Sequence, residues 1–105
     1  MTIQKLKKSN EFRHVFSTGN RKIGRYVNLY KLPLKQDYNR VGIVTKKNIG
    51  NAVQRNKVKR ILREIWRTRC NQLISGYDII ILARKKIVQA RYNEIEAELV
   101  KLIQS

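Results

Sequence analysis

The feature that most constrains the fold is residues 50–67, "GNAVQRNKVKRILREIWR", where apolar residues recur with a helical period among basic ones. Asn51 followed by Gln54 has the form of a capping box, which predicts a helix from there to about Leu73. At about 100° per residue, one side of this helix is apolar, with Val58, Ile61, Leu62, Ile65 and Trp66. The opposite side holds Asn56, Lys59, Arg60, Arg63 and Arg67. One face is therefore suited to a core, and the other is basic.

The segments on either side of this helix have the pattern of strands. Residues 40–46, "RVGIVTK", precede it, and residues 77–84, "YDIIILAR", follow it after Gly76. A strand that is apolar on both faces is typical of the centre of a covered sheet. A long helix between two strands predicts a βαβ crossover.

The rest of the chain completes an α/β pattern. Ser9 is placed to cap a helix that ends at Gly19 and carries on one face Phe12, Val15 and Phe16. Residues 25–33 alternate like a strand. Residues 92–104 predict a last helix whose inward side chains are Tyr92, Ile95, Leu99 and Leu102. We therefore expect one domain over residues 1–105, an α/β sandwich with main elements in the order α-β-β-α-β-α.

The charge of the chain indicates the kind of partner. It has 24 Lys and Arg against 7 Asp and Glu, which gives a formal charge of +17. A compact fold with this charge repels itself, and a polyanion is the simplest partner that offsets the repulsion. No long apolar run, lipidation signal or secretory signal points to a membrane or to export. The single cysteine, Cys70, fits a reducing compartment, so we expect a cytoplasmic protein that binds nucleic acid.

The basic face of the long helix has two interpretations. It could be an ordinary solvated face, but such faces usually mix Glu with Lys, because like charges at i,i+4 repel. Here Glu64 falls beside the basic stripe, and arginine outnumbers lysine on it, which suits bidentate binding of phosphate. Lys46, Lys47 and Gly50 come just before the helix, whose first N–H groups could hold a further phosphate.

A second surface is indicated around the first helix. Phe12 and Phe16 lie one turn apart, and one face of the predicted strand holds Tyr26, Asn28 and Tyr30. Aromatic rings beside basic groups can stack unpaired bases. A domain of this size also needs its Phe residues inside, and the pattern alone favours a core position for them.

Catalysis by the protein itself is not indicated. His14 is the only histidine, so Cys70 has no histidine pair of the kind that activates a nucleophile. No HExxH, CxxC or paired-carboxylate spacing offers metal ligands. We expect any reaction to use chemistry that a partner supplies.

The long helix and its approach resemble a known family. Residues 46–64, "KKNIGNAVQRNKVKRILRE", are similar to the signature of the bacterial ribonuclease P protein subunit, whose RNR motif lies in such a helix. The resemblance continues in "LKKSNEFRHVFSTGNR", "VNLYKL", "RVGIVTKK" and "YDIIILARK". It implies an α/β sandwich, ribosomal protein S5 domain 2-like, with a left-handed βαβ crossover, which is an exception to the right-handed rule.

The resemblance also implies a function. The family's protein binds a large catalytic RNA, and the complex removes the 5′ leader from precursor tRNA by endonucleolytic hydrolysis. The RNA holds the Mg²⁺ ions, so we expect no tightly bound metal, no activity of the protein alone, and a protein monomer in the holoenzyme. Together with the basic face, the resemblance assigns contacts with the RNA subunit to Lys46, Lys47, Gly50, Asn51, Arg55, Asn56, Lys59, Arg60, Arg63 and Arg67. It assigns the leader, and hence a cleft in place of a core, to Phe12, Phe16, Asn28 and Tyr30.

Three other classes share parts of this pattern. A structural RNA-binding protein of ribosomal type would have the basic helix but would need no open aromatic cleft. A helix-turn-helix module would need a short helix packed just before the basic helix, where this sequence predicts a strand. A self-sufficient nuclease would need a cluster of acidic residues or histidines that this sequence does not show.

Overall fold

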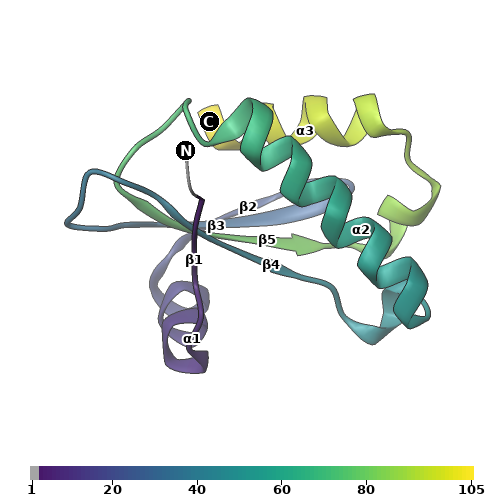
Figure 1. Ribbon diagram of the computed structural model, residues 1–105, viewed down its shortest axis with the longest axis horizontal. Helices are drawn as coiled ribbons and strands as arrows, with labels where there is room; N and C mark the ends of the chain where they lie inside the picture. Colours follow the sequence, from purple (N-terminus) through teal and green to yellow (C-terminus); the bar gives the residue numbers. More distant parts are fainter. Residues whose placement is uncertain (1–2) are drawn as a thin grey trace.

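A sheet lies between two helical layers, with α1 on one face and α2 and α3 on the other (Figure 1). The computed structural model describes residues 3–105. In chain order the elements are β1 (Gln4–Lys5), α1 (Ser9–Thr18), β2 (Asn20–Ile23), β3 (Val27–Pro33), β4 (Arg40–Val44), the 3₁₀ turn η1 (Lys47–Ile49), α2 (Ala52–Ile65), the π-helical turn η2 (Trp66–Cys70), β5 (Tyr77–Ala83), the 3₁₀ segment η3 (Lys85–Gln89) and α3 (Tyr92–Gln104). The expected α/β sandwich is confirmed.

The strand order is β1-β4-β5-β3-β2. β4 and β5 are parallel neighbours joined through α2, so the predicted βαβ crossover is present. β5 also pairs with β3, which places the strand that is apolar on both faces at the centre of the sheet. In Figure 1 both strands run to the right, β4 is nearer the viewer, and α2 lies above them. Seen from α2 with the strands pointing away, β5 is on the left of β4, so the crossover is left-handed.

The larger core lies between the sheet and the two helices α2 and α3. Its fully buried large side chains are Leu29, Leu62, Ile65, Trp66, Ile79, Ile81, Leu99 and Ile103. A smaller core lies on the other face of the sheet under α1, where the buried side chains are Leu6, Val15 and Ile80. β5 contributes to both cores because its alternate side chains point to opposite faces.

α2 begins at the predicted residue. Asn51 Oδ1 accepts from the Gln54 backbone N–H at 2.9 Å, and Gln54 Oε1 accepts from the Asn51 backbone N–H at 3.0 Å. Gly50, just before this cap, has a φ of 147°, and a Cβ at this position would overlap the Gln54 amide. The capping pair and the glycine together fix where the helix starts.

The predicted end of this helix near Leu73 is wrong. The α-helix ends at Ile65 and continues as a π-helical turn, in which the Asn71 N–H donates to the Trp66 carbonyl oxygen at 2.9 Å. Trp66 and Cys70, the first and last residues of this turn, are both inside the core, where they are 1% and 0% exposed. Sequence periodicity does not distinguish this turn from a continued α-helix.

Two short strands, β1 and β2, are absent from the sequence prediction. Each lies at an edge of the sheet, and their residues are mostly exposed. The apolar alternation that identifies a strand arises from burial of one face, and an edge strand of basic and polar residues lacks that signal. β2, "NRKI", is such a strand.

Two predictions at helix positions also need correction. Ser9 is the first residue of α1 and not its cap; the Lys8 N–H is bound instead by the carboxylate of Glu11, at 2.9 Å. In α3 the fully buried side chains are Ile95, Leu99 and Ile103. Ile95 and Leu99 are buried as predicted, and Leu102 is half-buried against the larger core. The prediction is wrong for Tyr92, which is 43% exposed, and it omitted Ile103, which continues the i,i+4 series.

The turn between β2 and β3 is fastened to α3. The Glu98 carboxylate accepts from the backbone N–H groups of Arg25, Tyr26 and Val27 at 2.6, 2.7 and 3.1 Å. The Tyr26 hydroxyl donates to Glu94 at 3.2 Å, and its ring packs against the larger core. Tyr26 therefore does not share the face of Asn28 and Tyr30 as predicted, because the regular alternation of β3 begins only at Val27.

Candidate nucleic-acid interface

The side of α2 that faces away from the sheet carries the predicted basic stripe. Arg60, Arg63 and Asn56 are exposed, and Lys59 is half-buried. They surround a shallow hollow of about 420 Å³ lined by Val53, Asn56, Lys57, Lys59, Arg60 and Arg63. This lining contains no acidic side chain, and the buried side chains of the helix lie on its other side. The arrangement suits closely spaced phosphate groups.

Two arginines of the predicted RNA-binding set have contacts within the protein. The Arg55 guanidinium Nη1 donates to the Gly50 carbonyl oxygen at 2.6 Å and so braces the approach to α2. The Arg67 Nη2 pairs with Glu64 Oε1 at 2.7 Å. Within residues 3–105, Arg60 and Arg63 take part in no ion pair. These two side chains have the full donor capacity of the guanidinium available to a ligand.

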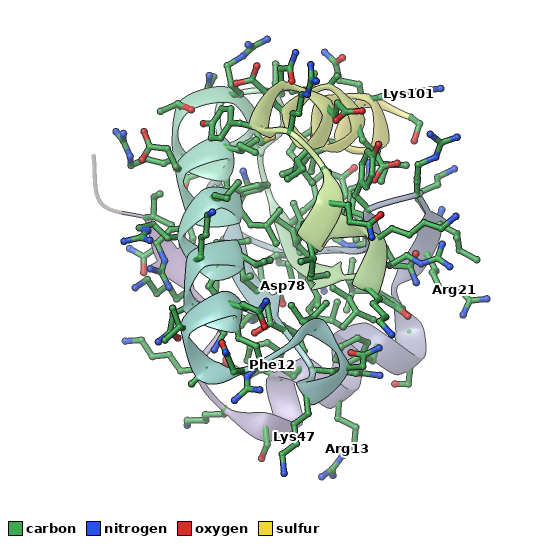
Figure 2. All side chains as sticks on the ribbon, turned by 90° about the vertical axis from the view of Figure 1, so that its right-hand side faces the viewer. Phe12, Arg13, Arg21, Lys47, Asp78 and Lys101 are labelled. Atoms are coloured by element: carbon green, nitrogen blue, oxygen red, sulfur yellow. The ribbon has the colours of Figure 1, made fainter. Side chains whose placement is uncertain are left out.

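The ends of β4 and β5 form a second basic area next to the start of α2. Lys46 and Lys47 follow β4 as predicted, and both are exposed; Figure 2 shows Lys47 pointing outward. Sequence reasoning missed three exposed residues that follow β5, namely Arg84, Lys85 and Lys86. Together with Ile49, they line a hollow of about 500 Å³. The predicted βαβ crossover could have indicated this second area, because two adjacent parallel strands end at the same edge of a sheet. The basic residues that follow β4 and β5 are therefore expected to lie close together.

The aromatic residues assigned to the leader lie together on the face of the sheet that α1 covers. Phe12 sits on Gly42, where an added Cβ would overlap its ring. Phe16 and Tyr30 meet edge to face, with ring centroids 4.8 Å apart and ring planes at 74°. All three rings are half-buried and pack against the smaller core. They therefore belong partly to the core and partly to the surface.

Asn28 lies on the same face of β3 as Tyr30, two residues before it in the strand. Its side chain is half-buried, and its Oδ1 atom has no hydrogen-bond partner within residues 3–105. β3 runs antiparallel to both β2 and β5, and Asn28 pairs with Ile23 on one side and Leu82 on the other. The predicted leader residues are thus brought together by α1 and β3.

A charged cluster anchors α1 to the sheet beside these rings. Arg40 on β4 donates through Nε and Nη2 to the two Asp78 oxygens, both at 2.7 Å, and through Nη1 to Glu11 at 2.6 Å. The other Glu11 oxygen accepts from the N–H groups of Lys8 and Lys7. These N–H groups, Lys8 first, and then the Arg40 charge lower the pKa of Glu11 to about 2. α1 is therefore held in a fixed position over β4 and β5.

The described residues offer little for metal or covalent chemistry. Residues 3–105 contain no group of three or more His, Cys, Asp or Glu side chains placed to hold a metal ion. Burial raises the pKa of the Cys70 thiol to about 12, which leaves it a poor nucleophile. Over the same part of the chain, none of the helices is both long enough and apolar enough to cross a lipid bilayer.

The fold and the two surfaces define a class of protein. It is a small, strongly basic α/β sandwich with a basic helix on one side of the sheet and half-exposed aromatic rings on the other. Such surfaces fit phosphate groups and unpaired bases, respectively.

Comparison with known proteins identifies the family within this class. The model of the family Ribonuclease P matches residues 2–105, and the chain belongs to this family. The ribonuclease P protein component of Caldanaerobacter subterraneus subsp. tengcongensis is 38% identical over 101 residues, which are 96% of this chain and 87% of that protein. The ribonuclease P protein from Thermotoga maritima superposes with a TM-score of 0.88 at 30% identity and 96% coverage of both chains. The ribonuclease P protein from Staphylococcus aureus superposes with a TM-score of 0.88 at 30% identity, with coverage of 98% of this chain and 94% of that chain.

Proposed function

We propose that this protein is the RNA-binding subunit of ribonuclease P. It contacts the catalytic RNA through α2 and the residues before it, and the single-stranded 5′ leader of precursor tRNA through α1 and β3. The complex removes the leader by endonucleolytic hydrolysis. The observation that carries this proposal is the placement of a basic surface and an aromatic surface on opposite faces of one sheet, in a chain of this family.

The basic surface is suited to the folded RNA subunit. Folded RNA presents phosphates at close spacing, and guanidinium groups bind them through paired hydrogen bonds. Arg60 and Arg63 have no acidic partner in the part of the chain that the structure describes, so binding of RNA breaks no internal ion pair at these positions. Arg55 and Arg67 are less free to rearrange, and we assign them mainly to shaping the two ends of the surface.

The aromatic surface is suited to a single strand. Unpaired bases stack on aromatic rings with little dependence on sequence. The edge-to-face contact of Phe16 with Tyr30 and the packing of Phe12 on Gly42 hold the rings in place before a ligand arrives. Mature tRNA has no leader, so this surface would distinguish the substrate from the product.

The protein's part in the chemistry would be electrostatic. The Mg²⁺ ions that activate the hydrolytic water would be held by the RNA, and the protein supplies no ligand cluster among its described residues. A charge of +17 beside two RNA molecules lowers their mutual repulsion and helps them associate. A structural RNA-binding protein of ribosomal type is the alternative; a footprint of the protein on ribosomal RNA, and none on ribonuclease P RNA, would favour it.

The deciding experiment compares precursor and mature tRNA. Because Phe16 is half-buried, Phe16→Leu keeps most of its apolar contact and is expected to lower the free energy of unfolding by less than about 1.5 kcal/mol. Loss of the stacking ring should lower the affinity of the reconstituted holoenzyme for precursor tRNA by about 1–3 kcal/mol. The affinity for mature tRNA should not change.

A matched control is available in the same cluster. Leu32 packs against the smaller core as Phe16 does but has no ring, so Leu32→Ala tests the effect of lost stability alone. The leader assignment is wrong if Phe16→Leu weakens binding of both RNAs equally, or if Leu32→Ala reproduces the selective loss.

A further inference from the structure

The sheet face that carries Tyr30 continues to the edge strand β2. The strand register aligns side chains of the same face in rows across β4, β5, β3 and β2. One row, partly under α1, consists of Gly42, Ile80, Tyr30 and Arg21. The next row consists of Val44, Leu82, Asn28 and Ile23. We use the name open row for the second row, Val44, Leu82, Asn28 and Ile23, together with Arg21 from the end of the first row.

The open row is less buried than the centre of the opposite face of the same strands, and its exposure increases toward β2. Leu29 on β3 and Ile81 on β5 face α2 and α3 and are 0% exposed. On the α1 side, Ile80 is also fully buried, but Leu82 is only half-buried and Ile23 is 59% exposed. Figure 1 shows the reason: α1 lies under one end of the sheet and leaves the end toward the start of α2 uncovered.

The charges around this surface favour an anionic occupant. Arg21 lies at its β2 edge and is exposed, and in Figure 2 its side chain points outward from the molecule. Arg13 on α1 and Lys47 after β4 project at the lower edge of the same view. A row with apolar side chains on β4, β5 and β2, and with basic residues at its margins, matches a nucleic-acid single strand, which combines base faces with phosphates.

We propose that the leader continues beyond Phe16 and Tyr30 onto the open row and ends at β2, where Ile23 supports a base and Arg21 binds a phosphate. This inference rests on the proposed leader site. The β4 end of the row lies beside Lys46, Lys47 and the start of α2, the side assigned to the catalytic RNA. The β2 end is therefore reached by leader nucleotides that are farther from the cleavage site.

The dimensions of the surface fit this assignment. Neighbouring strands are about 4.8 Å apart, so a row across four strands spans roughly 14 Å. In other RNA-binding proteins the open face of a four-stranded sheet accommodates about two or three stacked bases. The aromatic cluster and the open row together can therefore hold a short stretch of leader.

The test uses two neighbouring residues of β2 with opposite orientation. Arg21 pairs with Tyr30 and shares its face, whereas Lys22 pairs with Leu29 and shares the opposite face. Arg21→Gln and Lys22→Gln remove the same charge from the same strand. Affinities of the reconstituted holoenzyme are measured for precursor tRNAs whose leaders are lengthened one nucleotide at a time, with mature tRNA as the reference.

Arg21→Gln should reduce the affinity for the longer leaders by about three- to tenfold, as expected for one charge-assisted contact at an exposed position. The slope of log affinity against log salt should fall by about 0.7 for these RNAs, the value for one phosphate contact to a single strand. The shortest leader, mature tRNA and every RNA bound by Lys22→Gln should show no change.

A second variant tests the base platform. Ile23→Ala should weaken binding of the longer leaders, and this effect should vanish when their distal nucleotides are made abasic, while the effect of Arg21→Gln remains. Because Ile23 is 59% exposed, the substitution should leave the fold intact, which thermal unfolding would verify.

Three results would overturn the proposal: equal losses for Arg21→Gln and Lys22→Gln, a loss by Arg21→Gln that extends to mature tRNA, or no gain in affinity from longer leaders in the unmodified holoenzyme. A different result would show that the proposed leader site at Phe16 and Tyr30 is itself wrong. In that case Phe16→Leu would leave the binding of short-leader precursor tRNA unchanged, whatever the β2 variants do.

Discussion

Arg40→Met is the substitution whose effect follows most directly from the contacts in the structure. Methionine replaces the aliphatic part of the arginine side chain but removes the guanidinium that binds Asp78 twice and Glu11 once. The Asp78 side chain is only 7% exposed, so its carboxylate would be left inside the protein without a cation.

The magnitude follows from this burial. Removing one partner of a fully buried ion pair costs about 3–5 kcal/mol. The Arg40 side chain is 26% exposed, so water can partly replace it, and we expect about 2–3 kcal/mol. For a chain of 105 residues, a loss of 1 kcal/mol lowers Tm by about 4–8 °C, so the expected decrease in Tm is on the order of 10–20 °C.

The assay is urea unfolding followed by circular dichroism, with two further variants. Arg13→Met on α1 removes an exposed cation that has no ion pair within residues 3–105, and it should change stability by less than about 0.5 kcal/mol. Arg40→Met combined with Asp78→Leu removes the stranded carboxylate as well and should recover part of the loss. A cost for Arg40→Met of under about 1 kcal/mol, or a double variant as unstable as the single one, would refute the reasoning.

The other predictions concern the aromatic cluster, acid stability and the basic stripe. Gly42→Ala should lower the free energy of unfolding by about 1–3 kcal/mol because the added methyl overlaps the Phe12 ring, and adding Phe12→Ala should not make the loss additive; simple additivity would contradict the contact. The Glu11 pKa is lowered from 4.5 to about 2, so its stabilisation is complete above about pH 4.5 and is lost as pH falls toward 2. The stability difference between the unmodified protein and Glu11→Gln, measured by urea unfolding, should shrink over that range, and a constant difference would argue against the assignment. Arg60→Ala should weaken binding to ribonuclease P RNA by about 1–3 kcal/mol in a filter-binding assay, while Lys101→Ala on α3 should not; equal effects would indicate nonspecific attraction.

Local sequence signals predicted the parts of the protein that depend on local interactions. The capping pair of Asn51 and Gln54 set the start of α2, and the helical period separated its core face from its basic face before any tertiary contact was known. The continuous apolar run of β5 likewise indicated its central place in the sheet. Family resemblance, and not periodicity, gave the left-handed crossover and the assignment of the aromatic rings to a leader.

Tertiary structure decided the features that join distant segments. No local pattern reveals that Glu11, Arg40 and Asp78 form one cluster, or that a phenylalanine on α1 requires a glycine on β4. The edge strand β2 was not predicted, because an exposed strand has no alternation of buried and exposed residues. Only the register between β2 and β3 shows that Arg21 lies beside Tyr30. Periodicity reports which side of an element is buried, whereas the register of paired strands and the placement of α1 determine which side chains from separate elements share a surface.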